Sequence, residues 1–500
     1  MLDGSGSIAT FILFAAVVAI LVWGYNRAKA FGKLGILAWL QSIVLMSPWL
    51  LFFGLFALGI YLNLVSILFL LIASIAVYIW LGKQLRAEGQ EALLQQKAAE
   101  RIKQETAAEP ASSSQQSEFE QKNAVLEASP IPDEDLTILK TIFGIDTFFA
   151  TETIPYQDGA IFKGNLRGEP DTAYSKMSQK LEQAFNDKYR LFLVESPEEK
   201  PVVVILPKTN DPQTTTLAQK NLALILLIGT ILTSLEAASL LQGFDLFDNF
   251  GRYGEAIPLS LGLWSVLIAH EIGHRVIANR YQIRLSVPFF LPSWQIGSFG
   301  AITRFESLLP NRTVLFDISF AGPATAGIVS LLLLIFGLTL SHPGSMFQLP
   351  TEFFRGSILV GTLAKVILGS ALEKAVVDIH PLVVIGWLGL VITALNLLPA
   401  GKLDGGRVVH AIYGRKTARR STLATLIILG IVALFNPTNP IPLYWAVLIL
   451  FLQRDLERPV QNELTEPDDS RAAWGLLALF LTLATLIPLS ASLAGRIGLG

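Results

Sequence analysis

The chain has 500 residues, of which 52% are hydrophobic and only 16% are charged. Soluble domains carry roughly 25% charged residues, and the apolar residues here occur in long runs, so the composition predicts an integral membrane protein in a lipid bilayer. The net charge of −2 gives no argument for nucleic-acid binding, and the absence of cysteine excludes disulfides, cysteine-ligated zinc, iron–sulfur clusters and cysteine nucleophiles.

The N-terminal part is predicted to be a membrane anchor over residues 1–82. No charged residue lies between Leu34 and Gly82, and the apolar runs indicate three spans, at 8–25, 35–58 and 61–82. The sequence begins without the Arg- and Ser-rich stretch of a transit peptide and without a basic n-region. We therefore expect the first span to stay as an anchor.

Residues 83–130 are polar and are predicted to connect the anchor to a small domain. The stretch 83–105 is rich in Gln, Glu, Lys, Arg and Ala, which favours a solvated helix. The stretch 107–130 is rich in Ala, Ser, Gln and Pro, which is typical of a flexible linker.

Residues 131–215 have the texture of a small α+β domain. Apolar side chains recur at helical spacing over 171–189. Strand composition is found at 160–163, 190–194 and 201–206. The sequence GNLRG at 164–168 is interpreted as a turn that exposes Arg167.

Long apolar runs typical of membrane spans occur again in a predicted catalytic core at 219–455 and in a C-terminal region at 456–500. Candidate spans lie at 221–242, 257–280, 315–340, 381–399, 421–436, 441–453 and 473–494. The apolar stretch 356–379 contains four charged residues and is predicted to be an interfacial helix. The basic loops then fall on one side, which the positive-inside rule makes cytoplasmic. The predicted fold is a polytopic α-helical membrane protein of about 9–10 spans with a small cytoplasmic α+β domain.

The sequence HEIGH at 270–274 lies inside the span at 257–280 and has the form HExxH. Residues i and i+4 share one helical face, so His270 and His274 can reach one metal ion, and Glu271 can reach a metal-bound water as general base. Ionisable groups inside a span are costly and indicate function by default. The alternative is a buried polar cluster that fixes helix packing.

Zinc needs a third protein ligand and an open position. His342 and His380 are predicted to lie on the opposite side of the membrane, and His410 is expected in a basic loop. Asp404 closes an apolar run in the sequence LDGG, where the glycines allow a tight bend that turns the carboxylate inward. An Asp-Gly-Gly after a span is usually a turn, but beside a HExxH at the same depth Asp404 becomes the best candidate.

The segment 281–306 contains Pro, Gly and β-forming residues but no full span. Backbone of this kind at membrane depth must be shielded by protein or line a wet cavity, so we predict a re-entrant hairpin. Its edge could pair with an unwound substrate segment by strand addition. A plain cytoplasmic loop is the alternative.

Taken together, these motifs resemble the site-2 protease family of intramembrane zinc metalloproteases. The matches are HExxH, the pattern N-x-x-P-x-x-x-x-D-G through Asn396, Pro399, Asp404 and Gly405, and FAGPA at 320–324. The GNLRG sequence resembles the branch of chloroplasts and cyanobacteria called "ethylene-dependent gravitropism-deficient and yellow-green". With no transit peptide evident, a cyanobacterial member is expected.

The resemblance implies a role for each matched position. His270, His274 and Asp404 would ligate Zn²⁺, Glu271 would deprotonate the bound water, and Asn396 would help to hold substrate or oxyanion. Neither a PDZ-like insert nor paired CBS motifs are evident. The resemblance implies transmembrane protein substrates, cut within or beside their spans, in a plasma or thylakoid membrane with the active site on the cytoplasmic side.

Two other function classes predict different sequence features. A cation transporter predicts ionisable groups in several spans and pseudo-repeats, but the ionisable groups concentrate at 270–274. A proteolytically silent scaffold, binding partners through its cytoplasmic domain, predicts a broken motif, and this motif is intact.

Overall fold

The structure is a computed structural model that describes residues 131–496, except 157, 197, 295, 437–438 and 454, and parts of 22–84. The chain divides into two compact units, Met1–Gln121 and Lys122–Gly500. In the first unit, α2 (Gly32–Ala57) is a helix of 26 residues that covers the second predicted span. The predicted spans at 8–25 and 61–82 lie largely outside the described residues, and the linker at 107–130 lies wholly outside them.

Four helical segments among the described residues are long and apolar enough to cross a membrane. They are Gln219–Leu241, Phe250–Arg280, Arg312–Leu340 and Asp404–Phe435. They correspond to α7 (Leu217–Leu241), α8 (Tyr253–Arg280) with the short η2 (Phe250–Arg252), α9 (Arg312–Leu340) and α13 (Asp404–Phe435). These four helices therefore form the core of an integral membrane protein, in agreement with the apolar composition.

Three further helices of the core are shorter. The helix α12 (Pro381–Asn396) has 16 residues and a length of about 24 Å, less than the hydrocarbon thickness of a bilayer. The helix α14 (Ile441–Leu448) continues into a π-helical turn, η4 (Ile449–Gln453), and α15 (Asp469–Leu486) is followed by α16 (Ala491–Arg496). Each of these helices begins within a few residues of the start of a predicted span, so the sequence predicts their positions along the chain correctly.

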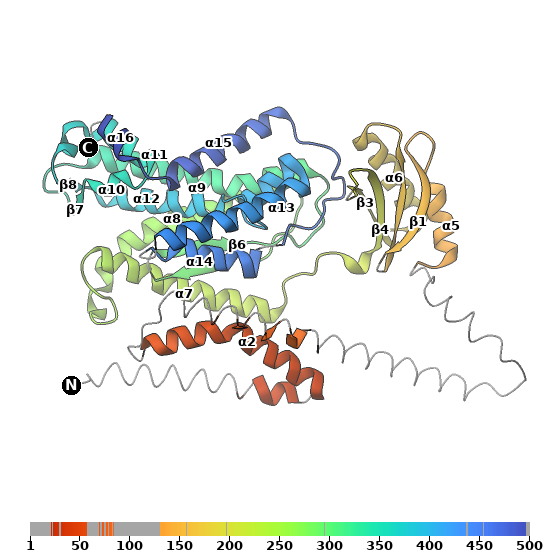
Figure 1. Cartoon of the computed structure of the whole chain (residues 1–500), viewed down its shortest axis with the longest axis horizontal. Coiled ribbons are helices and arrows are strands. Elements are labelled where there is room, and N and C mark those ends of the chain that lie inside the picture. Colours follow the sequence, from red (N-terminus) through yellow and green to blue (C-terminus); the bar gives the residue numbers. More distant parts are fainter. Residues whose placement is uncertain are drawn as a thin grey trace, which may run out of the picture. The chain divides into compact units, whose positions relative to one another are not determined.

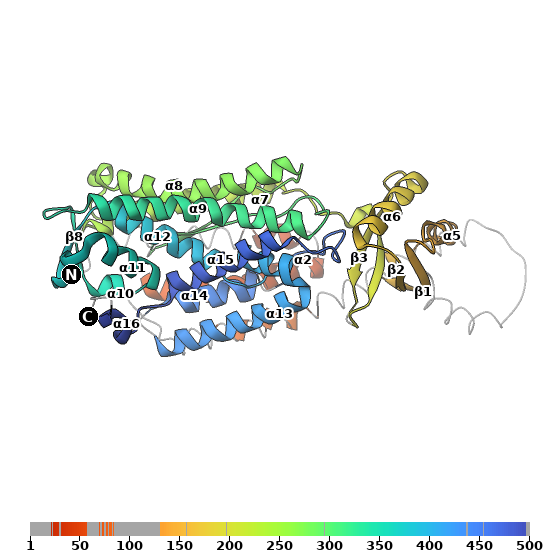
Figure 2. The ribbon, with the colours of Figure 1, turned by 90° about the horizontal axis from the view of Figure 1, so that it is seen from above.

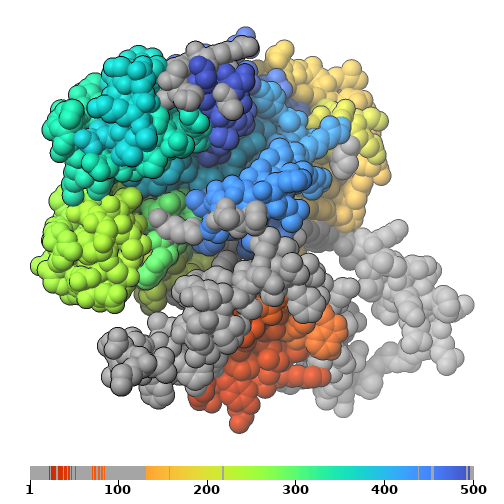
Figure 3. Space-filling model, turned by 60° about the vertical axis from the view of Figure 1, so that its left-hand side comes forward, coloured from red at the N-terminus to blue at the C-terminus, as the bar shows by residue number. Residues whose placement is uncertain are grey.

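The segment between α9 and α12 does not cross the core. Its longest helix, α11 (Ile358–Leu368), has 11 residues, too few to span a bilayer. It is flanked by α10 (Glu352–Arg355), η3 (Gly369–Glu373) and the antiparallel strands β7 (Phe347–Pro350) and β8 (Val376–Ile379). Figure 3 shows this segment in teal at the end of the core that also carries the α7–α8 connection in yellow-green.

The helix α9 packs against α8, α12 and α13, and Figure 2 shows it running alongside α8. Glycines allow the close approach to α12. A Cβ at Gly386 would lie 2.4 Å from the backbone nitrogen of Leu334, and one at Gly337 would lie 2.5 Å from that of Val383. Small residues at helix contacts are typical of membrane proteins, where van der Waals packing drives helix association.

The segment 281–306 forms a hairpin of β5 (Phe289–Ser293) and β6 (Gly297–Ile302). Both strands pack against α7, and β6 also contacts α8 and α12. Thr233 of α7 donates a hydrogen bond to the carbonyl of Gly297 over 2.6 Å. The hairpin itself is therefore confirmed, and helices of the core pack against it. Its re-entrant position at membrane depth stays a prediction.

Within the second unit, residues 133–207 fold around an antiparallel sheet, and we call this part the sheet domain (Figure 1). Its antiparallel sheet has the strand order β1-β2-β4-β3. The elements are α5 (Asp133–Ile142), β1 (Phe148–Tyr156), β2 (Gly159–Leu166), α6 (Pro170–Phe185), β3 (Tyr189–Glu195) and β4 (Pro201–Pro207), followed by a 3-10 turn, η1 (Lys208–Asn210). Both helices and all four strands contribute to one hydrophobic core.

The predicted turn at GNLRG is wrong. Gly164, Asn165 and Leu166 belong to β2 and pair with Ala150, Phe149 and Phe148 of β1. A Cβ at Gly164 would lie 2.1 Å from the carbonyl oxygen of Phe149, so this glycine serves close strand contact. Arg167 follows the strand and is exposed, as expected.

The stretch after Asp404 is also not the predicted loop. The helix α13 begins at Asp404 itself and continues through the basic residues to Phe435, with one break at Gly414 (φ +76°). His410 is therefore a buried helical residue.

A short piece of the loop after α14, the bridging segment 461–463, joins the sheet domain to the core. The amide of Leu193 in the edge strand β3 donates to Gln461, and Glu463 donates back to Leu193, over 2.8 and 2.9 Å. On the other side, the amides of Gln461 and Asn462 donate to Leu309 and Pro310 just before α9, both over 2.9 Å. The edge strand β3 is thereby paired with the bridging segment at Leu193.

Candidate active site and metal centre

Three side chains from two helices converge on one point inside the core. The Nε2 atoms of His270 and His274 lie 3.0 Å apart, and Oδ2 of Asp404 lies 3.1 Å from the first and 3.4 Å from the second. All three residues are buried. Among the described residues, this is the one group of three potential metal-ligating side chains found within 4.8 Å of one another.

The three atoms have the chemistry and spacing of a zinc site. Ligand atoms on a tetrahedral zinc, each at roughly 2.0–2.1 Å from the ion, lie about 3.3 Å from one another, which matches the three distances. Nδ1 of His274 lies 2.7 Å from the carbonyl oxygen of Ile318. A proton on Nδ1 that donates to this carbonyl leaves Nε2 free to bind a metal, the usual arrangement for a ligating histidine. The residues present therefore fit a zinc ion.

Helical periodicity and two glycines bring the histidines into place. His270 and His274 lie one turn apart on α8, so both rings leave the same face. That face lies against α9 at a very close crossing. A Cβ at Gly273 would lie 2.5 Å from the carbonyl oxygen of Ala321, and one at Gly322 would lie 2.3 Å from Nε2 of His274. The small residues of the FAGPA sequence thus make room for the imidazole.

A tight reversal of the chain brings Asp404 to the histidines. The turn after α12 includes Gly401 with φ +51°, and α13 begins at Asp404. A Cβ at Gly405 would lie 2.0 Å from the carbonyl oxygen of Leu397, and one at Gly406 would lie 2.4 Å from that of Gly401. The two glycines allow the first turn of α13 to lie directly against the preceding backbone, which sets the depth of the carboxylate.

Glu271 lies beside this centre, and its carboxylate accepts a hydrogen bond from a hydroxyl group. Thr303, at the end of the β5–β6 hairpin, donates to its carboxylate with Oγ1 at 3.0 Å from Oε1 and 3.2 Å from Oε2. A cavity of about 10 Å³, lined among others by His270, Glu271 and Gly300, adjoins them. A space of this size holds about one water molecule. The carboxylate is thus placed beside room for a water.

Asn396 connects α12 to the hairpin. Its side-chain nitrogen donates to the carbonyl of Phe299 over 3.1 Å and to that of Ile392 over 2.9 Å. A Cβ at Gly300, where φ is +101°, would lie 2.7 Å from the same nitrogen. Both amide hydrogens are engaged in the structure as it stands, so its part in holding substrate or oxyanion stays a prediction.

The other three histidines lie outside the centre. Nε2 of His410 faces the carboxylate of Glu463, 3.1 Å from each oxygen. His380 caps α12, where its Nδ1 accepts the amide hydrogen of Leu382. His342 is an exposed residue of a turn. These contacts agree with the prediction that the third ligand is a carboxylate.

Three residues near the centre were missed by the sequence analysis. They are Thr303, Arg407 and Glu457, all of which the structure connects through hydrogen bonds. Burial alone would raise the pKa of Glu457, but the neighbouring Arg407 guanidinium outweighs it and lowers that pKa below its ordinary value. Arg407 lies one turn after Asp404, so a helix beginning at Asp404 would have indicated it.

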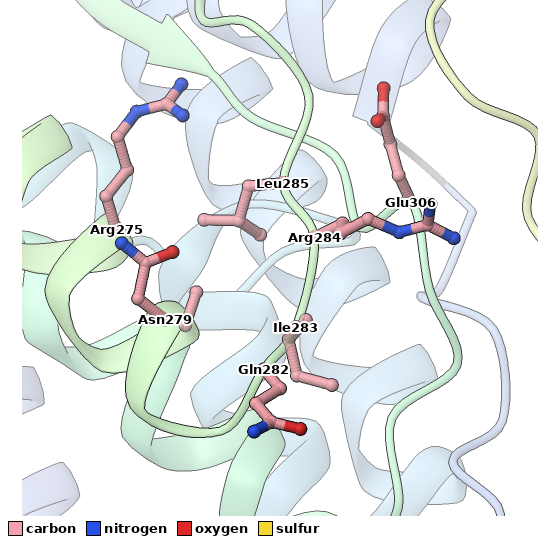
Figure 4. A pocket seen from close by; sticks show the side chains of 8 residues that line it. Arg275, Asn279, Gln282, Ile283, Arg284, Leu285 and Glu306 are labelled. Atoms are coloured by element: carbon pink, nitrogen blue, oxygen red, sulfur yellow. The ribbon is translucent and has the colours of Figure 1, made fainter.

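A polar cavity of about 360 Å³ lies at the C-terminal end of α8 (Figure 4). Arg275, one turn beyond Glu271, and Glu306, just after the hairpin, line it together with Arg284. A guanidinium nitrogen of Arg275 lies 3.8 Å from the Glu271 carboxylate. The cavity thus approaches the HExxH residues from the end of the helix.

Comparisons with known proteins match both parts of the chain. The model of peptidase family M50 matches residues 258–436, and that of the EGY3 middle domain matches residues 137–213. No solved structure matches.

Several curated relatives are plant proteins. Probable zinc metalloprotease EGY2, chloroplastic, of Arabidopsis thaliana is 41% identical over 377 residues, 73% of this chain and 67% of the relative. Probable zinc metalloprotease EGY1, chloroplastic, of the same plant is 35% identical over 404 residues, 73% of each. Probable zinc metallopeptidase EGY3, chloroplastic, is 35% identical over 378 residues, 71% of this chain and 65% of the relative.

These relatives are chloroplast proteins, so they do not support the expected cyanobacterial origin. They and the family model do support a protease whose metal is zinc. The identity over two thirds or more of both chains and the match at the HExxH region lead to one assignment: this chain belongs to peptidase family M50, the site-2 proteases.

Proposed function

We propose that this membrane zinc protease hydrolyses peptide bonds within or beside the transmembrane segments of other membrane proteins. The observation that carries the proposal is the convergence of His270, His274 and Asp404 inside a core of membrane-length helices, with Glu271 beside them. A buried site of this kind is within reach of segments that lie in the bilayer. This cleavage would release a regulator from the membrane or contribute to the turnover of membrane proteins.

In the proposed mechanism, His270, His274 and Asp404 would hold zinc, which when bound would supply Lewis acidity toward the scissile carbonyl and toward water. Glu271 takes a proton from the attacking water and passes it to the leaving amine. Thr303 keeps the Glu271 carboxylate oriented toward the reacting atoms. The surrounding apolar side chains exclude other water, which strengthens each of these electrostatic interactions.

The substrate must lose its helical hydrogen bonds before a peptide bond can be attacked. We propose that an unwound substrate segment pairs with the edge of the β5–β6 hairpin, which ends at Thr303 beside Glu271. The polar cavity at the end of α8 would admit water and the juxtamembrane part of the substrate. Helix-destabilising residues in a substrate span would therefore favour cleavage.

We further propose that the sheet domain and the site-proximal ends of the helices face the cytoplasmic side. The basic residues after α8 and in the first half of α13 support this orientation. Because the chain has no cysteine, Arg167→Cys introduces a single label site at an exposed position just after β2. Labelling of closed vesicles of known sidedness by a membrane-impermeant maleimide then reports the side directly.

The protease proposal is tested by comparing new protein N-termini in membranes from cells with wild type, Glu271→Gln and the control Glu255→Gln. Glu255 lies at the start of the same helix, exposed and paired with Arg252. Specific transmembrane proteins should be cut with wild type and with the control but not with Glu271→Gln, although all three bind zinc. Identical profiles in zinc-loaded samples would contradict the proposal and favour a silent scaffold.

A further inference from the structure

Arg407 is a buried cation that no motif assigns to the reaction. Its side chain is 7% exposed and lies on the first turns of α13, three residues after Asp404. The guanidinium lies over the ring of Phe305, 4.7 Å from its centre. A buried guanidinium is retained only where its donors are satisfied, so the partners of Arg407 indicate what it does.

The first partner is the backbone of Thr303. A terminal nitrogen of Arg407 donates to the Thr303 carbonyl over 3.0 Å. The hydroxyl group of the same threonine donates to Glu271. The guanidinium therefore fixes the residue that orients the proposed catalytic base.

The second partner is the carboxylate of Asp404. The other terminal nitrogen of Arg407 lies 3.7 Å from Oδ1 of Asp404, whereas Oδ2 faces the two histidines. One guanidinium thus contacts the residue that supports Glu271 and the oxygen of Asp404 that points away from the metal position. The positions of Glu271 and Asp404 therefore both depend on this guanidinium.

The third partner, Glu457, shares with the Thr303 carbonyl one terminal nitrogen of the guanidinium. Its carboxylate accepts from Nε and a terminal nitrogen of Arg407, over 3.0 and 2.8 Å. Glu457 belongs to the loop that leads to the bridging segment 461–463. That loop is fixed in turn by Glu463, which is buried against His410.

We propose that Arg407, held by Glu457, is a positioning residue that sets the distance between the base Glu271 and the ligand Asp404. A planar fork can satisfy Glu457, the Thr303 carbonyl and Asp404 at the same time, which an ammonium on a flexible stem does not do. The inference rests on the proposed role of Glu271, but its geometric part does not depend on proteolysis.

The test compares Arg407→Gln, Arg407→Lys, Glu457→Gln and the double variant Arg407→Gln/Glu457→Gln with the control Glu466→Gln. The Glu466 side chain lies in the same loop and is 75% exposed. Each full-length protein is purified in detergent and loaded with cobalt in place of zinc. Two readouts are then recorded: the cobalt absorption spectrum and the amide hydrogen exchange of residues 297–306.

Arg407→Gln and Glu457→Gln should each speed exchange in this segment about 10-fold or more, because each removes a charged hydrogen bond. Both should change the cobalt spectrum while the thermal midpoint stays above the measuring temperature. Arg407→Lys should recover only part of the protection. The double variant should be no worse than Arg407→Gln alone, since the two residues act as one unit. The Glu466→Gln control should behave as wild type.

A cleavage assay on a substrate found by the N-terminus comparison adds a kinetic readout. Mutating a residue that supports a metal ligand typically lowers activity about 10- to 100-fold, and here the loss should fall on kcat, with KM unchanged.

Exchange and cobalt spectra like those of wild type in Arg407→Gln and Glu457→Gln overturn the proposal. A perturbed Arg407→Gln beside a normal Glu457→Gln refutes the role of Glu457, and equal perturbation by Glu466→Gln makes the effect non-specific. If exchange and the cobalt spectrum respond to the Arg407 variants as expected but the wild type cleaves no substrate, the protease proposal is contradicted instead.

Discussion

The α-carbon of Gly322 lies directly against the imidazole of His274, so that a methyl group on it would come within 2.3 Å of Nε2. This is the ring nitrogen that faces Asp404 and His270. The closeness of α8 and α9 at this point is therefore a condition for the metal site and not merely for helix packing.

Gly322→Ala should lower bound zinc and destabilise the protein by roughly 1–3 kcal/mol, because the added methyl group forces the ring or the helices apart. Gly327→Ala on the same helix is the matched control, since a Cβ there would meet Thr393 at an ordinary 3.8 Å. Zinc per chain and the thermal midpoint are measured for both. Full zinc occupancy in Gly322→Ala would contradict the prediction.

Replacing His274 and replacing His410 should have opposite signatures. His274→Ala should abolish stoichiometric zinc binding, because it removes one of three converging ligand atoms. His410→Ala should retain zinc but lose roughly 3–5 kcal/mol of stability, because it leaves the buried Glu463 without its imidazole partner. Metal analysis and denaturant titration separate the two effects. Zinc loss in His410→Ala at temperatures where it stays folded would speak against this assignment.

Thr303→Val should impair catalysis without removing zinc. The substitution keeps the shape of the side chain but deletes the hydroxyl group that donates to Glu271. A lost hydrogen bond to a charged group corresponds to a fall in kcat of about 10- to 100-fold. Thr303→Ser retains the donor and should recover most of the rate. Equal rates for the valine and serine variants would show that the hydroxyl group is not needed.

Stability should fall as the pH falls through 4.5, in part because of Glu463. Burial alone would raise the pKa of this carboxyl, but His410 and Arg415 outweigh it and lower the pKa below its ordinary value of 4.5. Between the folded pKa and 4.5 the unfolded chain binds more protons, so acid favours unfolding in that window. Glu463→Gln should be less stable at neutral pH and should lose less on acidification. Thermal midpoints from pH 6 to pH 3 check this, and parallel curves for both proteins would count against it.

The parts of the site that sequence analysis could predict are those in which one local pattern carries the chemistry. The i, i+4 spacing of His270 and His274 needs only the helix on which they lie. Asp404 was found because its glycines indicated a tight bend beside an apolar run, and the structure shows those glycines pressed against backbone. The hairpin is expected because its segment contains prolines, glycines and β-forming residues but no full span.

The parts that could not be predicted depend on partners distant in the sequence. The basic run after Asp404 was interpreted as a loop, because nothing local shows that Arg407 and His410 are matched by Glu457 and Glu463. Likewise, GNLRG looks like a turn until β1 is placed beside it, where Gly164 is needed for strand contact. Thr303 has no motif, since its role arises only where the hairpin meets α8.

The bridging segment 461–463 is synthesised long after the strand β3 with which it pairs. The strand β3 is made before the candidate spans of the core, whereas the residues that cover its edge follow α14. An uncovered edge strand is a template for pairing with other chains. Until residue 463 has been synthesised, the edge strand of the sheet domain therefore lacks this partner, and the pairing can form only after α7 to α14 have been made.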